Sequence, residues 1–168
     1  LLICEGYMDI VSLYEKGIES VVAPLGTAFT EQQLYLAWKY CFKPTIMFDG
    51  DSAGLRAAYK TALMSLGHIT AKRLIQFILL PQNEDPDSFV NKNGKNYFLD
   101  FTKKSKLTIH QFIFSHYKKQ TENDPSSLAV FEKKLRSIAN TIKDNFIKKY
   151  VLEYFLEKIS EFPKELST

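Results

Sequence analysis

The strongest constraint on the fold is an alternation of short apolar runs with amphipathic stretches over the first hundred residues. The apolar runs predict strands near 1–4, 20–23, 44–48 and 73–79. The stretches between them predict helices near 7–17, 30–41 and 53–66. Strands that are separated by single helices form βαβ units, whose right-handed crossovers make the strands parallel. We therefore expect an α/β fold, with a mostly parallel sheet flanked by helices.

The end of the chain follows a different period. From about residue 105 the apolar residues recur at helical spacing throughout, and Pro125 marks the entry to the last helical region. One apolar stripe follows alternating three- and four-residue steps and comprises Leu128, Phe131, Leu135, Ile138 and Ile142. A break near Asp144 divides this region. We expect an α/β part over residues 1–100 and, packed against it, a small helical bundle over residues 101–168.

The two parts differ in charge. Residues 1–100 carry 9 basic and 11 acidic side chains, whereas residues 101–168 carry 13 basic and 8 acidic ones. An acidic half joined to a basic half is typical of an enzyme that acts on nucleic acid. The basic side chains of the tail do not gather on one helical face and have no aromatic residues interleaved with them, so we favour a solvated surface. They are Lys103, Lys104, Lys106, Lys118, Lys119, Lys133, Lys134, Arg136, Lys148 and Lys149.

Acidic clusters follow three of the predicted strands. Glu5 and Asp9 follow the first strand, Asp49 and Asp51 the third, and the group Glu84, Asp85 and Asp87 the fourth. The carboxyl ends of parallel strands meet at one edge of a sheet, where ligands bind. Carboxylates gathered there repel one another unless a hard divalent cation neutralises them. The pattern predicts a magnesium-dependent phosphoryl-transfer site, at which two ions could hold the attacking and leaving oxygens.

Some of these acids also have a simpler interpretation. Asp9 falls in the first turn of a predicted helix, where the helix dipole favours a carboxylate. Asp85 precedes Pro86 and is well placed to cap a short helix that ends at Gly94. An Asp-x-Asp pair can equally consist of loop acids or helix caps. Glu5 is the hardest to explain structurally, because a helix entry after a core strand rarely contains an unpaired glutamate.

Other sites are not indicated. The chain has two cysteines, Cys4 and Cys41, in apolar segments and without a Cys-x-x-Cys or Cys/His cluster, so we expect no zinc site in this chain. Buried free thiols fit a reducing cytoplasm. No apolar run approaches the ~20 residues of a membrane span, and we expect no membrane partner. The histidines (His68, His110 and His116) are interpreted as structural or surface residues.

Four strings resemble the ordered motifs of the TOPRIM fold and, more narrowly, those of the catalytic RNA-polymerase domain of bacterial replicative DNA primases. They are Glu5-Gly6-Tyr7-Met8-Asp9, Pro24-Leu25-Gly26-Thr27-Ala28, Asp49-Gly50-Asp51-Ser52-Ala53-Gly54 and Glu84-Asp85-Pro86-Asp87. The resemblance covers residues 1 to about 90. The helical tail resembles the C-terminal helical subdomain of that domain in position and pattern.

The resemblance implies a TOPRIM subdomain over 1–100 and a catalytic centre formed by Glu5, Asp49 and Asp51. It implies that two or more Mg²⁺ or Mn²⁺ ions are held by Glu5, Asp9, Asp49, Asp51, Asp85 and Asp87. Glu5 would be either a metal ligand or a proton-transfer group. The implied reaction joins ribonucleoside triphosphates into a short RNA primer on a single-stranded DNA template, in the cytoplasm at the replication fork.

Other parts of such primases lie outside this chain. These parts are a zinc-binding domain, a basic subdomain that forms the opposite wall of the catalytic cleft, and a domain that binds the replicative helicase. The chain begins at Leu1 without a methionine, which is more consistent with an excised domain than with a natural N-terminus. We therefore expect the chain to bind Mg²⁺ or Mn²⁺ and to be nearly inactive alone.

Two alternative functions share the same fold. A topoisomerase or nuclease of the TOPRIM type is the first, although a type IA topoisomerase needs a nucleophilic tyrosine in a separate domain. The tyrosines of this chain are interpreted as packing residues. A scaffold that only binds DNA is the second, and the full acidic set argues against it, because a pure binding module gains nothing from carboxylates that face phosphates.

Overall fold

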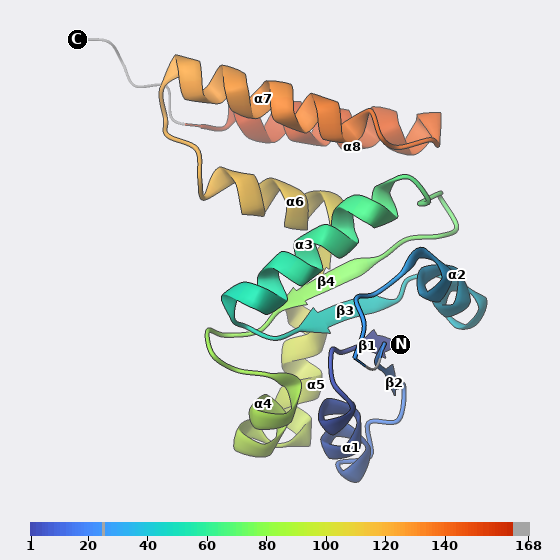
Figure 1. Ribbon diagram of the computed structural model, residues 1–168. Helices are drawn as coiled ribbons and strands as arrows, with labels where there is room; N and C mark the ends of the chain where they lie inside the picture. Colours follow the sequence, from blue (N-terminus) through green and yellow to red (C-terminus); the bar gives the residue numbers. More distant parts are fainter. Residues whose placement is uncertain (25, 163–168) are drawn as a thin grey trace.

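A five-stranded sheet with helices on both faces forms the centre of the molecule (Figure 1). The computed structural model describes residues 1–24 and 26–162. The strands are β1 (Leu2–Ile3), β2 (Val21–Val22), β3 (Thr45–Phe48), β4 (Gln76–Leu79) and β5 (Leu107–Thr108). Their order is β2-β1-β3-β4-β5, in which the first four are parallel and β5 pairs antiparallel with β4. The expected α/β fold with a mostly parallel sheet is confirmed.

Eight helices connect and follow these strands within the described part of the chain. They are α1 (Tyr7–Glu15), α2 (Glu31–Tyr40), α3 (Ser52–Leu66), α4 (Pro86–Asn93), α5 (Lys95–Lys104), α6 (Ile109–Lys118), α7 (Pro125–Ala139) and α8 (Asn145–Ser160). Local signals set several of the boundaries. Asp124 and Asp144 accept backbone N–H groups at the starts of α7 and α8, which ends the loops at those residues.

The strands bury both faces, as expected for a parallel sheet between helices. On β3, Ile46 and Phe48 point into a core shared with α2, α3 and α6, whereas Met47 points into a second core with α1, α4 and α5. On β4, Phe77 and Ile78 alternate in the same way. The period of two along each strand therefore explains why the apolar runs are continuous.

The last helices extend the first of these cores. The rings of Phe77 on β4 and Phe112 on α6 stack with centroids 4.4 Å apart. Helices α7 and α8 lie together on the far side of α6 from the sheet (Figure 1), and their residues Phe131 and Phe155 are buried in the same cluster as the strand residues. The expected helical bundle is present, and it shares its core with the sheet.

Two elements differ from the sequence prediction. The prediction of helix throughout from residue 105 is wrong at Leu107–Thr108, which form β5 before Thr108 caps α6 through the backbone N–H of Gln111. Helix α5 was not predicted; it starts directly after Gly94 and crosses residue 100. The division of the chain at residue 100 stays a prediction. Of the predicted residues, Leu25 and residues 163–168 lie outside the described part.

None of the helices in the described part of the chain is both long enough and apolar enough to cross a bilayer.

Candidate metal and phosphoryl-transfer site

The sheet topology brings the acidic clusters to one edge of the sheet. Strands β1, β3 and β4 are adjacent and parallel, so the segments that follow them emerge side by side. The pKa of Asp49 rises from 3.8 to about 6, first through burial and then through the negative charges of Glu5, Asp9, Asp85 and Asp51. These five carboxylates are therefore close enough to repel one another. Burial raises the pKa of Asp9, the backbone N–H groups of Gly6 and Asp87 lower it, and the charges of Asp85 and Asp87 raise it, so Asp87 also lies close to this set.

Two glycines fix the path of the loop after β3. A Cβ atom on Gly50 would lie 2.0 Å from the carbonyl oxygen of Pro81, and one on Gly54 would lie 2.2 Å from that of Asp49. The N–H of Gly50 donates to the carbonyl of Glu84 at 2.7 Å, which joins the second acidic cluster to the third. Only glycine allows these approaches, so the two glycines determine where the acids of this loop lie.

Asp51 and Asp85 cap helices. Asp51 accepts the backbone N–H of Gly54 at 2.7 Å at the start of α3, and Asp85 accepts that of Ser88 at 2.6 Å at the start of α4. The capping role expected for Asp85 is confirmed, with Pro86 at the first helical position. Asp51 is exposed and keeps its other oxygen free of this bond, so capping leaves it able to bind a cation.

Asp9 and Asp87 join α1 to α4. The carboxylate of Asp9 is buried and accepts the N–H of Gly6 at 3.0 Å and the N–H of Asp87 at 3.3 Å. Asp87 in turn accepts the hydroxyl of Ser12, a buried residue of α1, and the side-chain amide of Asn91 at 2.7 Å. Both acids therefore hold the two helices together at the edge of the site.

Glu5 and Asp49 have no comparable structural partners. Oε1 of Glu5 is buried and accepts no hydrogen bond from residues 1–24 or 26–162. Burial raises the pKa of Glu5, the backbone N–H of Asp49 lowers it, and the charges of Asp51 and Asp9 raise it. The carboxylate of Asp49 likewise accepts no hydrogen bond within the described residues, and its pKa is the most perturbed of the set. Such perturbed acids in a cleft are typical of functional sites.

The donor set fits a hard divalent cation. A buried, unpaired carboxylate oxygen and several mutually repelling carboxylates are what a positive ion would relieve. Within the described residues, no three acidic, histidine or cysteine side chains are grouped closely enough to hold one ion by themselves. That arrangement suits Mg²⁺, which keeps several waters and takes only one or two carboxylates.

Glu84 is separated from this set by its own partners. It forms an ion pair with Lys92 at 2.6 Å and accepts the hydroxyl of Ser88 at 2.8 Å, and both bonds lower its pKa. It therefore stabilises the start of α4 rather than facing the other carboxylates.

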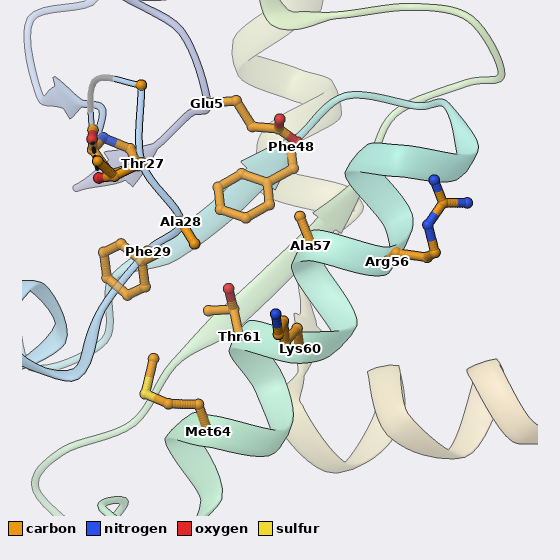
Figure 2. Close-up of a pocket in the computed structure, with 12 residues that line it drawn as sticks. Glu5, Thr27, Ala28, Phe29, Phe48, Arg56, Ala57, Lys60, Thr61 and Met64 are labelled. Carbon is orange, nitrogen blue, oxygen red and sulfur yellow. Dashed lines mark hydrogen bonds between the residues drawn. The ribbon is translucent and has the colours of Figure 1, made fainter.

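The structure adds residues that the sequence analysis did not assign to the site. Lys119, from the loop after α6, lines a recess together with Asp49 and Asp51. Glu5 lines a separate cleft, whose lining also includes Arg56 and Lys60 of α3 (Figure 2). In the sequence, the only indication that Arg56 and Lys60 lie together is their spacing of four residues on one predicted helix. No local signal connects Lys119 with residues that lie about seventy positions earlier.

The remaining residues considered from sequence lie away from the acids. His68 contacts Tyr35 and Glu31, and His116 stacks on Tyr59 with ring centroids 4.0 Å apart, so both have the structural roles expected of them. Cys4 is buried as expected, whereas Cys41 at the end of α2 is partly exposed.

This fold and acidic edge define a class of protein. The model of the Toprim-like family matches residues 2–90, and the chain belongs to that family. Over more of its length it is similar to DNA primases. It is 33% identical over 159 residues to the DNA primase of Rickettsia typhi, which covers 94% of this chain and 27% of that protein. It is 40% identical over 114 residues to that of Legionella pneumophila, covering 68% of this chain and 20% of that protein.

Solved structures of primases have the same fold. The catalytic core of the Escherichia coli primase superposes with a TM-score of 0.85 at 28% identity, covering 100% of this chain and 53% of that one. A DNA primase domain from Pseudomonas aeruginosa gives a TM-score of 0.88 at 25% identity, covering 95% and 50%. A DnaG primase catalytic domain that was solved bound to single-stranded DNA gives 0.86 at 29% identity, covering 97% and 51%.

Proposed function

We propose that this chain forms the metal-binding catalytic part of a DNA primase, a DNA-templated RNA polymerase that makes short primers for replication. The observation that carries the proposal is the pair Glu5 and Asp49, two partly buried carboxylates at adjacent strand ends. Oε1 of Glu5 has no hydrogen-bond partner within the described residues, and the carboxylate of Asp49 accepts no hydrogen bond there. Support also comes from the extent of the similarity. The Toprim-like match ends at residue 90, whereas the primase relatives continue into the helical tail.

The proposal assigns a role to each acid. Asp49 and Asp51 would hold Mg²⁺ or Mn²⁺, assisted by Asp85, Asp87 and Asp9 from the neighbouring helices. Bound divalent ions would neutralise the phosphates of a nucleoside triphosphate and stabilise the charge that develops on the transferred group. Glu5, with its raised pKa and buried oxygen, would either complete the ligand set or accept the proton of the attacking hydroxyl.

The chain's own structure orients these groups. The bonds between α1 and α4 hold Asp9 and Asp87 at a fixed distance from the strand ends, and the caps of α3 and α4 fix the rotamers of Asp51 and Asp85. Apolar cores on both faces of the sheet exclude water beneath the site. The carboxylates are thus preorganised, which reduces the cost of rearrangement when charge is transferred.

The partners follow from the proposed reaction. They are a single-stranded DNA template, ribonucleoside triphosphates and, through a region outside this chain, the replicative helicase. The expected location is the cytoplasm, at the replication fork. In this proposal the chain forms one wall of the catalytic cleft, and we expect the 168-residue chain to bind metal but to synthesise almost no primer by itself.

Similarity over the helical tail argues against the other TOPRIM functions. A topoisomerase or nuclease would share the first ninety residues, where the family match lies, and would not be expected to share the tail as well. A scaffold that only binds DNA would have no use for unpaired carboxylates that repel phosphates.

Metal binding tests the proposal most directly. We would titrate the purified chain with MnCl₂ and follow free Mn²⁺ by electron paramagnetic resonance. We expect saturable Mn²⁺ binding, and we expect Asp49→Asn to weaken it about tenfold or more. The control Glu122→Gln, which removes an exposed acid of the tail, should leave the affinity unchanged. Wild-type affinity in Asp49→Asn would contradict the assignment. So would vigorous templated primer synthesis by a full-length primase that carries this chain with Asp49→Asn.

A further inference from the structure

Asp87, in the first turn of α4, is held through only one of its two carboxylate oxygens. Its Oδ1 accepts the hydroxyl of Ser12 from α1 and the side-chain amide of Asn91 at 2.7 Å. Its backbone N–H donates to Oδ1 of Asp9 at 3.3 Å. Within residues 1–24 and 26–162, Oδ2 of Asp87 accepts no hydrogen bond. The two oxygens of this acid therefore have different surroundings.

The hydroxyl of Ser12 bonds to a neighbouring helix rather than along its own. Within a helix, a serine hydroxyl commonly donates to the carbonyl four residues earlier, as the buried Ser65 of α3 does to Thr61 at 2.7 Å. Ser12 is also buried, yet its hydroxyl reaches Asp87 on α4. Because water has little access to a buried hydroxyl, this donor stays committed to the carboxylate.

Asn91 supplies the second donor to the same oxygen. It lies one turn after Asp87 on α4, and its amide reaches back to the carboxylate. Asn93 on the same helix also reaches back four residues, but its amide donates to the backbone carbonyl of Phe89 at 2.9 Å. A backbone acceptor is therefore available to an asparagine on this helix, and the bond from Asn91 to the acid is specific to its position.

The two bonds limit what Asp87 can offer to a cation. Each carboxylate oxygen has two lone pairs that can accept a hydrogen bond. Ser12 and Asn91 use both acceptor positions of Oδ1, so Oδ2 alone is left for an ion. Mg²⁺ demands near-octahedral geometry and few carboxylates, whereas Ca²⁺ accepts more oxygens, including both from one carboxylate. A carboxylate with one oxygen available suits the smaller ion.

We propose that Ser12 and Asn91 are positioning residues that reserve a single oxygen of Asp87 for the divalent ion of the site, and that they thereby favour Mg²⁺ and Mn²⁺ over Ca²⁺. The inference rests on the proposed function, in which Asp87 assists metal binding. It extends that function by naming two residues that contact no metal themselves and yet determine which ion the site selects.

The packing of α1 against α4 does not depend on these two residues. Leu13 on α1 and Phe89 and Val90 on α4 are buried in one core. The bond from the backbone N–H of Asp87 to Asp9 also joins the helices and involves neither positioning residue. A purely structural role of the two donors would therefore affect stability and leave the choice of cation unchanged.

Titration of the 168-residue chain with MnCl₂, followed by electron paramagnetic resonance, tests the inference. We expect Ser12→Ala and Asn91→Ala each to weaken Mn²⁺ binding about threefold or more, and the double variant about tenfold or more. The matched controls are Ser65→Ala, which removes another buried helix hydroxyl, and Asn93→Ala, which removes the other amide of α4. Both should bind Mn²⁺ like the wild type. Asn91 is exposed, so its variant gives the result even should Ser12→Ala fail to fold.

Two further measurements respond to positioning and not to structure alone. Competition with CaCl₂ gives the ratio of the Ca²⁺ and Mn²⁺ dissociation constants. In the double variant this ratio should shift toward Ca²⁺ by about threefold or more, because Oδ1 of Asp87 is released for a second contact. In an Asp87→Asn background, Ser12→Ala should cause no further loss of Mn²⁺ affinity, because the ligand that it positions is already removed.

Several results would overturn the inference and leave the ions at Asp49 unaffected. These are wild-type Mn²⁺ affinity in the double variant, an unchanged ratio of Ca²⁺ to Mn²⁺ affinity, equal losses in the two controls, or an undiminished effect of Ser12→Ala in the Asp87→Asn background. A wild-type chain that binds no Mn²⁺ would instead contradict the proposed function, and the inference with it. The two failures are thus distinguishable.

Discussion

Neutralising Asp49 should make the metal-free protein more stable while weakening its affinity for Mn²⁺ about tenfold or more. The carboxyl of Asp49 has a pKa of about 6 instead of 3.8, so the folded protein binds its proton more tightly than the unfolded chain does. Below about pH 4 Asp49 is protonated in both states and does not destabilise the fold. Its ionised carboxylate destabilises the folded state fully above about pH 6. Asp49→Asn removes that destabilisation.

The size of the effect follows from the same displacement of the pKa. A pKa raised from 3.8 to about 6 means that the fully ionised carboxylate lowers the free energy of unfolding by about 3 kcal/mol. Because Asp49 is partly exposed, screening by water reduces this to about 1.5 kcal/mol. We expect Asp49→Asn to raise the free energy of unfolding by that amount at about pH 7.5, or Tm by ~3–6 °C.

Urea denaturation at several pH values checks this prediction. The gain from Asp49→Asn should shrink as the pH falls from about 7.5 through 6 toward 4. Glu122→Gln, in an exposed position, should change stability by less than about 0.5 kcal/mol at any pH. Addition of MnCl₂ should stabilise the wild type more than the variant, because we expect the variant to bind the ion about tenfold more weakly in the folded state. A variant that is less stable than the wild type at neutral pH would refute the reasoning.

Three other substitutions test how the site is built. Gly54→Ala should destabilise the fold by about 2 kcal/mol or more, since its Cβ would meet the carbonyl of Asp49, whereas Gly67→Ala, with 3.9 Å of clearance, should be nearly neutral in the same urea titration. Asp85→Ala should cost about 1 kcal/mol through the lost cap of α4, and an unchanged urea midpoint would contradict that role. Phe155→Ala should cost about 3–5 kcal/mol and keep one transition by both circular dichroism and Trp38 fluorescence; separate transitions would argue against a shared core.

The acidic edge was predictable because its signals are local. Each cluster follows its own strand within a few residues, and the rule that carboxyl ends of parallel strands meet at one edge needs no knowledge of distant contacts. The caps are also local, as Asp85 with Pro86 shows. The roles of the six acids as metal ligands stay predictions until metal binding is measured.

Contacts between distant segments could not be predicted in this way. The hydroxyl of Ser12 reaches Asp87 across 75 positions, and Ser12 by itself looks like an ordinary helix residue. Lys119 belongs to a series of lysines that the sequence interprets as solvated surface, yet the end of α6 places it beside Asp51. Likewise, β5 has only two residues, which is too short to show the alternation of apolar and polar residues typical of a strand. It forms because the edge of β4 is available for pairing.

The acids of this site divide by the bonds they make. Asp9, Asp51, Asp85 and Asp87 all accept backbone or hydroxyl groups that hold helices in place, and a substitution at any of them would change the structure along with any metal affinity it has. The carboxylate of Asp49 accepts no such bond. Glu5 interacts with the backbone N–H of Asp49, but its buried Oε1 has no partner within the described residues, so substitutions at these two acids disturb fewer structural contacts. A loss of activity at the four bonded acids therefore identifies a ligand only where unfolding is measured alongside it, whereas a loss at Glu5 with undiminished stability is direct evidence for a catalytic role.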